Sequence, residues 1–125
     1  MNIVAIGAHP DDLEIFAYGF LAAASSRGDN LILGVATDGA AGGVNQGAEL
    51  ARQRADEARN GLASLGTPTL LDLPDGQLAD APNARNCIRG FIRDAAPDLV
   101  ITHAPEDYHP DHRALAAYVR DAAGF

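Results

Sequence analysis

The 125-residue chain has a single cysteine, Cys87, so it can form no internal disulfide and offers no thiolate cluster to a metal. It has no apolar run long enough to span a bilayer, and its first residues lack the basic segment and long apolar stretch of a secretory signal. Positive charge is scarce, because 9 Lys and Arg stand against 17 Asp and Glu, for a net charge of -8. We therefore expect a cytoplasmic protein with no membrane span and no nucleic-acid partner.

What the chain does contain is enough for one folded domain. A chain of this length buries roughly two thirds of its unfolded surface, and 47% of the residues are hydrophobic. We find no internal repeat, low-complexity tract or linker. A single domain over residues 1–125 is the expectation.

Short apolar runs alternate with helical patterns along this sequence. Strands are expected at residues 2–7, 31–36, 69–73 and 98–102, and helices at residues 13–26, 47–65, 83–95 and 111–123. The strands are apolar throughout, which is typical of a parallel sheet that is covered by helices on both faces. The predicted class is α/β with a mostly parallel sheet.

Polar residues follow each of the expected strands. The loops after them contain His-Pro-Asp-Asp (residues 9–12), Thr-Asp-Gly (37–39), Pro-Asp-Gly (74–76) and the segment 103–112, and these loops hold all 4 histidines. Ligands of open α/β sheets bind outside the carboxyl ends of the strands. The sequence therefore predicts a functional site at this edge of the sheet.

Two tetrapeptides carry the chemistry, one from His9 to Asp12 and one from His109 to His112. His9 and Asp12 are three residues apart across a tight turn, so both can point at one position. A catalytic zinc needs three nitrogen or oxygen ligands and one open position for water. His9, Asp12 and one histidine of the second tetrapeptide supply that number, which predicts a divalent metal site with zinc as the favoured ion.

Local structure offers a simpler explanation for parts of this pattern. Asp11, Asp12 and Asp111 each stand where an N-cap is common, and a proline in the first turn of a helix needs no function. Each tetrapeptide alone is weak evidence, because short motifs often occur by chance. Both together, each after a predicted strand, favour a site.

The chain resembles the LmbE-like, or PIG-L, N-acetylglucosaminyl deacetylase family. The similarity is carried by residues 8–12 with Glu14, 37–39, Arg54-x-x-Glu57-Ala58, 65–66, 73–76, 97–103 and 107–112. It implies a Rossmann-like three-layer sandwich and a zinc-dependent hydrolase, with other divalent metals as alternatives. It also implies a small-molecule substrate that bears an N-acetylated amino sugar.

The resemblance implies a role for each residue of the first tetrapeptide and for the end of the second. His9, Asp12 and His112 match the metal ligands of the family. Asp11 matches the general base that acts on metal-bound water. Physical chemistry agrees with these roles, since zinc lowers the pKa of its water to about 7 and a nearby carboxylate can take the remaining proton.

Further roles are implied for residues around the metal. His109 matches the residue that stabilises the oxyanion or protonates the leaving amine, and Asp111 matches the residue that holds its ring. Arg54 and Asp75 match positions that contact the sugar or its attached group. Arg54 is equally well explained as a solvated surface arginine, and Asp75 as an ordinary turn residue.

The sequence departs from the family in two places. Helix one is bulkier, with Phe16, Tyr18 and Phe20 where many members have small residues, and Ala40 and Ala41 replace an acidic residue. The chain also ends early relative to the family, which is consistent with a fragment, a truncated form completed by homo-oligomerisation, or a degenerate remnant. The intact set of catalytic residues favours the first two.

Two other functions compete with hydrolysis. A non-catalytic metal-binding or assembly module would keep the metal ligands without a working substrate pocket. Nucleotide binding is disfavoured, because the loop after the first strand has no glycine-rich fingerprint and its carboxylates would repel a pyrophosphate.

Overall fold

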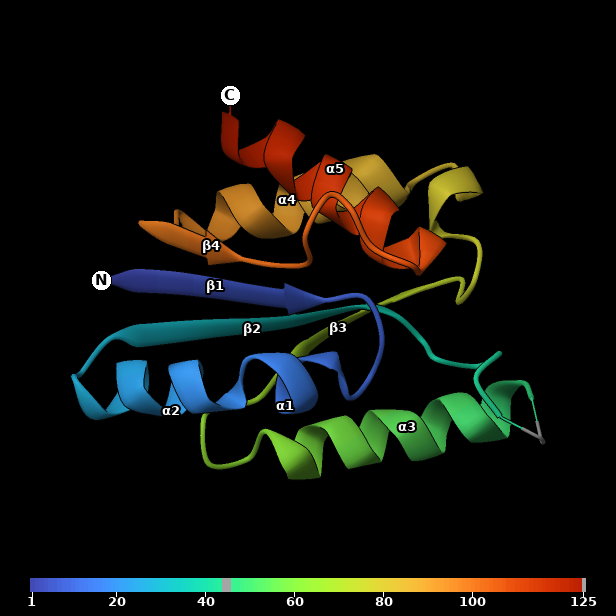
Figure 1. Cartoon of the computed structure of the whole chain (residues 1–125). Coiled ribbons are helices and arrows are strands. Elements are labelled where there is room, and N and C mark those ends of the chain that lie inside the picture. The colour runs from blue at the N-terminus through green and yellow to red at the C-terminus, as the bar shows by residue number, and fades with distance from the viewer. Residues whose placement is uncertain (44–45, 125) are drawn as a thin grey trace.

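The structure is a computed structural model that describes residues 1–43 and 46–124. A four-stranded parallel sheet in the order β3-β2-β1-β4 lies between two layers of helices (Figure 1). The strands are β1 (Asn2–Gly7), β2 (Asn30–Thr37), β3 (Thr69–Leu73) and β4 (Leu99–Ile101). This arrangement confirms the predicted α/β class and the three-layer sandwich.

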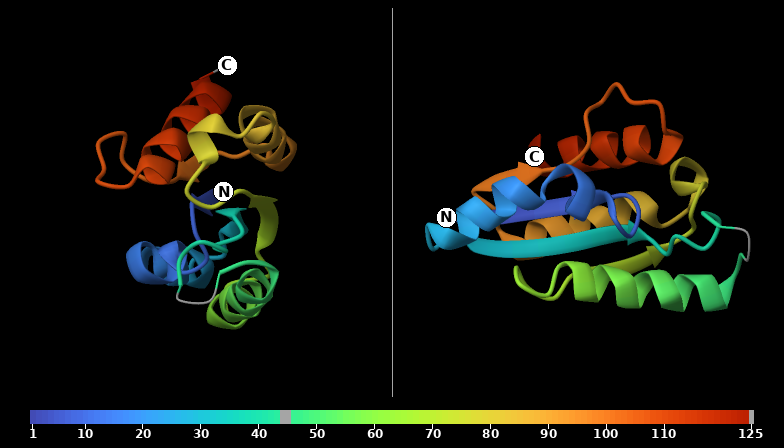
Figure 2. Two further views of the ribbon diagram at one scale, coloured as in Figure 1. Left: turned by 90° about the vertical axis from the view of Figure 1, so that its right-hand side faces the viewer. Right: turned by 60° about the horizontal axis from the view of Figure 1, so that its bottom comes forward.

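The helices divide between the two faces of the sheet (Figures 1 and 2). One layer holds α1 (Asp12–Phe16), α2 (Tyr18–Ser26) and α3 (Ala48–Gly61). The other holds α4 (Ala84–Ala95) and α5 (Pro110–Gly124), and the short 3-10 helix η1 (Leu78–Asp80) contacts α5. Each β-strand is thus followed by a helix, and the strand-to-helix loops gather at one edge of the sheet.

Two apolar cores, one on each face of the sheet, explain why the strands are apolar at successive positions. Val4 and Ile6 of β1 pack with the α4–α5 layer, whereas Ala5 packs with Leu13 and Leu21 of the α1–α2 layer. All three β1 residues are inaccessible to solvent. A strand that is buried on both sides has no polar face, which explains why the sequence of this strand is apolar throughout.

The expected helix over residues 13–26 is divided in two. Ala17 leaves helical geometry with φ -125° and ψ -8°, so α1 ends at Phe16 and α2 begins at Tyr18. Ala17 nevertheless packs in the apolar core, so the hydrophobic spacing continues across the break. Periodicity therefore predicted the buried positions correctly but not the interruption of the backbone.

Strand β3 contains a distortion that the sequence pattern does not predict. Asp72 adopts a left-handed backbone with φ 55°, and the pairing register of β2 with β3 shifts between Val35 and Thr37. A bulge of this kind bends a strand and redirects the residues that follow. The chain beyond it, including Asp75, turns toward the loop after β1.

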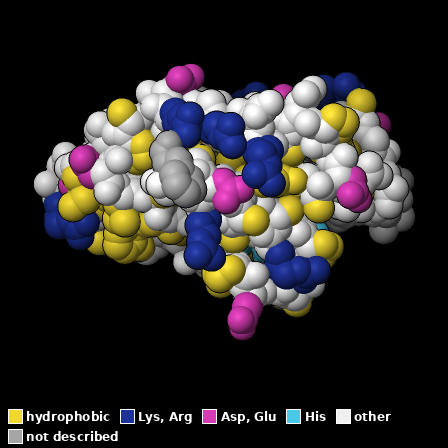
Figure 3. All heavy atoms as spheres, turned by 90° about the horizontal axis from the view of Figure 1, so that it is seen from above, with side chains coloured by type: hydrophobic (Ala, Val, Ile, Leu, Met, Phe, Trp, Pro, Cys, Tyr) yellow, Lys and Arg dark blue, Asp and Glu magenta, His cyan; other side chains and the backbone are white. Residues whose placement is uncertain are grey.

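The surface over α4 and α5 mixes arginine with acidic side chains (Figure 3). Arg85 of α4 forms an ion pair of 2.8 Å with Asp121 of α5 and stacks over the ring of Tyr118. Among the helices of residues 1–43 and 46–124, none combines the length and the apolar character that crossing a membrane requires.

Candidate metal centre

The loops that follow the strands meet at the carboxyl edge of the sheet, which faces the viewer in the left panel of Figure 2. A cavity of about 240 Å³ opens there. It is lined by His9, Asp11, Asp12, Ile15, Phe16, Gly42, Arg54, Asp75, Tyr108, His109 and His112. Every predicted site residue except Asp111 belongs to this lining, as expected for the strand ends of a parallel sheet.

A tight turn after β1 separates the two neighbouring aspartates. Asp12 folds back so that its Oδ2 accepts a hydrogen bond of 2.8 Å from the backbone N–H of His9, and its side chain is buried. Gly7 makes room for this turn, because a Cβ at that position would lie only 2.8 Å from the Cβ of Asp12. Asp11 has φ 113° and a side chain that is 54% exposed. One carboxylate thus lies inside the fold and the other borders the cavity.

Three potential ligand atoms from the two tetrapeptides lie close together. Oδ2 of Asp12 is 3.5 Å from Nδ1 of His9 and 3.4 Å from Nε2 of His112. Ligands placed about 2.1 Å from a tetrahedral zinc lie about 3.4 Å from one another. The three residues offer atoms that are all within 4.8 Å of each other, so their spacing fits one shared ion.

The orientation of the His112 ring also fits a metal. Its Nδ1 lies 3.0 Å from Oδ1 of Asp107, and its buried Nε2 has no hydrogen-bond partner among residues 1–43 and 46–124. A hydrogen bond from the backbone N–H of His109 holds the pKa of Asp107 below its usual value, so its carboxylate accepts the proton of Nδ1. Burial and the neighbouring His103 lower the pKa of His112. A neutral ring with its proton on Nδ1 presents a free lone pair on Nε2.

His9 is held by carboxylates on both sides of its ring. Its Nε2 lies 2.8 Å from Oδ2 of Asp111 and 3.1 Å from Oδ1 of Asp75, while Nδ1 faces Asp12. Burial lowers the pKa of His9, but its hydrogen bonds with Asp12 and Asp111 outweigh burial and raise the pKa to about 9. A carboxylate on the far nitrogen of a ligating histidine is the usual way to fix its ring.

Asp111 supports His9 instead of the partner expected from the family. Its side chain is 1% exposed and accepts hydrogen bonds from the backbone N–H groups of Gly76 (2.8 Å) and Leu78 (3.1 Å) as well as contacting His9. Its contact with His109 runs through the backbone, because the Asp111 N–H donates to Nδ1 of that ring at 3.0 Å. The carboxylate of Asp111 was expected to hold the ring of His109, but in the structure it contacts the ring of His9.

His109 lies beside the potential ligands. Its ring centroid is 4.5 Å from that of His9 and 4.9 Å from that of His112. Since Nδ1 accepts the Asp111 N–H, the proton of a neutral His109 ring resides on Nε2. His109 therefore offers an N–H donor next to the ligand set.

His103 is a site residue whose role the sequence left open. Its Nε2 lies 3.1 Å from Oδ2 of Asp12 and 3.0 Å from the backbone N of Ala8, and its ring stacks on His112 at 3.7 Å. Burial would raise the pKa of Asp12, but hydrogen bonds with His103 and His9 hold it well below its usual range. Asp107 was likewise given no role, although a carboxylate five residues before a potential histidine ligand was a usable signal.

The two predicted substrate-binding residues form part of the cavity wall and also contact the protein. Nη2 of Arg54 donates to the carbonyl of Pro10 at 2.8 Å and lies 3.4 Å from Oδ2 of Asp11. Asp75 contacts His9 and accepts a hydrogen bond of 2.9 Å from the N–H of Ala41. Their side chains are 17% and 8% exposed, respectively, so neither is a freely solvated surface group.

Part of the cavity rim is apolar. Ile15, Phe16 and Tyr108 line it and are exposed, Tyr108 by 83%. Phe16 is one of the bulky residues that distinguish this chain from the family pattern, and it forms part of the pocket wall.

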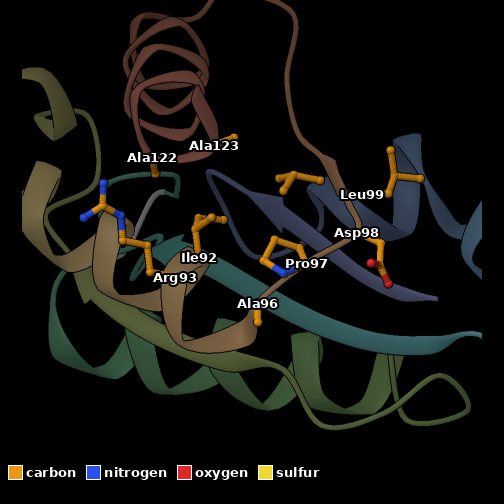
Figure 4. Close-up of a pocket in the computed structure, with 9 residues that line it drawn as sticks. Ile92, Arg93, Ala96, Pro97, Asp98, Leu99, Ala122 and Ala123 are labelled. Atoms are coloured by element: carbon orange, nitrogen blue, oxygen red, sulfur yellow. The ribbon is translucent and has the colours of Figure 1, made fainter. Parts of the chain in front are cut away.

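A larger cavity, of about 580 Å³, lies where α4, β4 and α5 meet near the amino end of β4 (Figure 4). It is lined by Ile92, Arg93, Ala96, Pro97, Asp98, Leu99, Val100, Ala122 and Ala123. This lining has no histidine, and its charged side chains are one arginine and one aspartate. It offers no set of metal ligands, so the smaller cavity is the candidate site.

Known structures share this fold. N,N'-diacetylchitobiose deacetylase from Pyrococcus horikoshii, solved with its inhibitor MPG, superposes with a TM-score of 0.88 and 28% identity over 98% of this chain and 49% of its own. The conserved protein TT1542 from Thermus thermophilus gives 0.81 and 28%, over 99% of this chain and 56% of its own. This chain therefore spans about half the length of each.

A third structure shows that the fold alone does not fix the reaction. GalB, the 4-carboxy-2-hydroxymuconate hydratase from Pseudomonas putida KT2440, gives a TM-score of 0.86 at 21% identity, over 98% of this chain and 55% of its own. Family membership rests on the sequence. The family described as PIG-L, GlcNAc-PI de-N-acetylase, matches residues 4–123, and the chain belongs to this family.

Proposed function

We propose that this chain forms the catalytic domain of a zinc-dependent hydrolase that removes an N-acetyl, or another N-acyl, group from a small molecule containing an amino sugar. The observation that carries the proposal is the close approach of His9, Asp12 and His112 beside Asp11 in one cavity. The family description and the diacetylchitobiose deacetylase structure both name N-deacetylation of such sugars, which supports the same reaction.

His9 through Nδ1, Asp12 through its carboxylate and His112 through Nε2 would hold the ion. Bound zinc, or another divalent metal, would lower the pKa of a water molecule and polarise the carbonyl of the substrate. Asp111 and Asp107 keep the two imidazole rings turned so that these nitrogens face Asp12. The donor set of two nitrogens and one oxygen is the type that catalytic zinc uses.

Asp11 is the general base in this proposal. Its carboxylate borders the cavity next to Asp12, and burial raises the pKa of Asp11 although Arg54 nearby acts in the opposite direction. A higher pKa makes the carboxylate a better proton acceptor near neutral pH. Asp11 would take the proton of the attacking water and deliver it toward the departing amine.

His109 is the proposed donor to the reacting amide. Its Nε2–H would stabilise negative charge that develops on the carbonyl oxygen, or protonate the leaving nitrogen. Asp75 and Arg54 bound the space that the sugar or its attached group would occupy. The apolar rim of Ile15, Phe16 and Tyr108 suits the less polar face of a sugar or an attached apolar group.

The decisive experiment measures metal content and hydrolysis on the same preparations. The purified 125-residue protein should hold one divalent ion per chain and should release acetate from N,N'-diacetylchitobiose or N-acetylglucosamine. Asp12→Ala should lose the ion and the activity together. Asp11→Asn should keep the ion and lose most of the activity, because the amide cannot accept the proton.

Asp56→Asn on α3 is a matched control, because this aspartate is 74% exposed and pairs with Arg59 away from the cavity. It should retain both properties. Absence of a stoichiometric ion from the parent protein would refute the metal mechanism. Stoichiometric metal with no hydrolysis of any N-acylated sugar would favour the non-catalytic binding module instead.

A further inference from the structure

We propose that Arg54 is a positioning residue, which holds the backbone and carboxylate of Asp11 in place, and that this task, more than contact with the substrate, accounts for its presence in the cavity wall. The inference rests on the proposed function only in naming Asp11 as the base. The structural claim is that an arginine of α3 stabilises the loop after β1, and this claim depends only on the contacts of that loop.

Asp11 needs such support because its backbone is unusual. With φ 113° it occupies a region that residues with a side chain rarely adopt. A conformation of this kind persists only where the surrounding structure enforces it, and it is found mainly at functional sites. The side chain of Asp11 makes no cap hydrogen bond to α1. The restraint must therefore come from other contacts.

Arg54 contacts both the peptide that precedes Asp11 and the carboxylate of Asp11. Its Nη2 donates to the carbonyl of Pro10 at 2.8 Å and lies 3.4 Å from Oδ2 of Asp11. The first contact fixes the peptide that enters Asp11, and the second restrains where the carboxylate points. Both contacts use the same nitrogen, which the planar guanidinium holds in a fixed direction, whereas the ammonium of a lysine turns freely at the end of a flexible chain.

The glycine-rich loop after β2 encloses the arginine. A Cβ at Gly42 would overlap Nη1 of Arg54, and a Cβ at Gly39 would lie 2.9 Å from its Nε. The side chain of Arg54 is consequently only 17% exposed. Two glycines thus leave room for the guanidinium to reach the loop after β1. This packing gives a physical reason for small residues in that loop.

The same contacts favour a positioning role for Arg54 over a role in substrate binding. An arginine that mainly binds substrate should present its guanidinium to the cavity and leave the protein backbone alone. Here one terminal nitrogen is already engaged with Pro10 and Asp11, and the other lies against Gly42. Removing Arg54 should therefore loosen the loop even when no substrate is present.

Hydrogen–deuterium exchange of the substrate-free protein, measured with a chelator present, tests this directly. Arg54→Ala should speed exchange of the amides of residues 11–13, and Arg54→Lys should do so to a smaller extent. Arg59→Ala is the matched control, since it lies on the same helix and pairs with Asp56 at the surface. Unchanged exchange in Arg54→Ala would overturn the proposal, whether or not the parent protein is a hydrolase.

A second variant covers the case in which Arg54→Ala does not fold. Gly42→Ala keeps the arginine but displaces its guanidinium, so it should loosen the same amides. The two changes combined should add little to either alone, because both break one contact. Full additivity, or no effect of Gly42→Ala on these amides, would contradict the proposed role.

If the parent protein is active, its kinetics distinguish positioning of Asp11 by Arg54 from binding of the substrate by Arg54. Arg54→Ala should lower kcat by about 100-fold, since a misplaced catalytic group costs this much, while the affinity for glucosamine, the amine product, stays the same. A loss of glucosamine affinity that matches the loss of kcat/KM would assign Arg54 to the substrate instead. Inactivity of the parent would refute the proposed function and leave the exchange experiment valid.

Discussion

The carboxylate of Asp107 lies 3.0 Å from Nδ1 of His112, and the same oxygen accepts the backbone N–H of His109 at 2.9 Å. One acidic residue in the loop before α5 thus fixes a ring of the second tetrapeptide and also the backbone at its start. The opposite nitrogen of His112 is buried, has no hydrogen-bond partner in the part of the chain that the structure describes, and lies 3.4 Å from Oδ2 of Asp12. A proton fixed on one nitrogen makes the other available to a metal.

The first prediction follows from this contact. Asp107→Ala should weaken zinc binding by about 10- to 100-fold, the usual cost of losing a residue that orients a ligating histidine. Titration calorimetry in a competing chelator measures the affinity. Asp121→Ala, which removes only a surface partner of Arg85, should bind zinc like the parent. Equal affinity in both variants would show that Asp107 does not orient the ring.

Asp111 gives a prediction about stability. Its buried carboxylate accepts hydrogen bonds from the N–H groups of Gly76 and Leu78 and contacts His9. Asp111→Ala leaves these groups unsatisfied, and each buried polar group without a partner costs about 1–3 kcal/mol. Urea denaturation of metal-free protein should show a loss of several kcal/mol.

Asp111→Asn is the companion variant for that measurement. It preserves the shape of the side chain and one acceptor oxygen, so its loss of stability should be smaller. His109→Ala removes the ring to which the Asp111 backbone donates but keeps the buried carboxylate. If His109→Ala destabilised the protein as much as Asp111→Ala, the carboxylate would not be the main support.

The convergence of the two tetrapeptides was predictable because it follows from topology. Parallel strands joined by helices bring all their carboxyl ends to one edge, so His9 and His112 approach each other although they are 103 positions apart. Spacing within each tetrapeptide then indicated which side chains share a direction. The structure brings Asp12 between these histidines as that reasoning required.

The pairing of carboxylates with imidazoles was not predictable in the same way. Whether Asp111 contacts His109 or His9 depends on how the start of α5 packs against residues 76–78, which is a tertiary contact that spacing does not encode. The break at Ala17 was missed for a related reason, because hydrophobic periodicity reports burial and is silent about a local change of backbone angle.

The pKa of His9 leads to a prediction about pH. In the metal-free protein, hydrogen bonds with Asp12 and Asp111 overcome burial and raise the pKa of His9 from 6.5 to about 9. Zinc must displace the proton from Nδ1, so its apparent affinity should rise about tenfold per pH unit between pH 6.5 and 9. Calorimetry in buffers of different ionisation enthalpy would detect the released proton. Affinity that is flat over this range would contradict the assignment.

The stability of the metal-free fold should change in the opposite direction. A raised pKa means that His9 stabilises the fold fully below pH 6.5, and that this contribution is lost as the pH rises through about 9. Urea denaturation with a chelator present should show this decline. His9→Gln, which cannot be protonated, supplies the control and should show a weaker dependence over the same interval.

The bulge in β3 gives the last prediction. Asp72 has φ 55°, a conformation that glycine adopts freely and that a β-branched residue adopts only at a cost of about 1–3 kcal/mol. Asp72→Gly should leave the free energy of unfolding near that of the parent, whereas Asp72→Val should reduce it by that amount. Because Asp75 lies three residues further on and contacts His9, Asp72→Val should also weaken zinc binding. A stable Asp72→Val protein with normal zinc affinity would show that the bulge does not position Asp75.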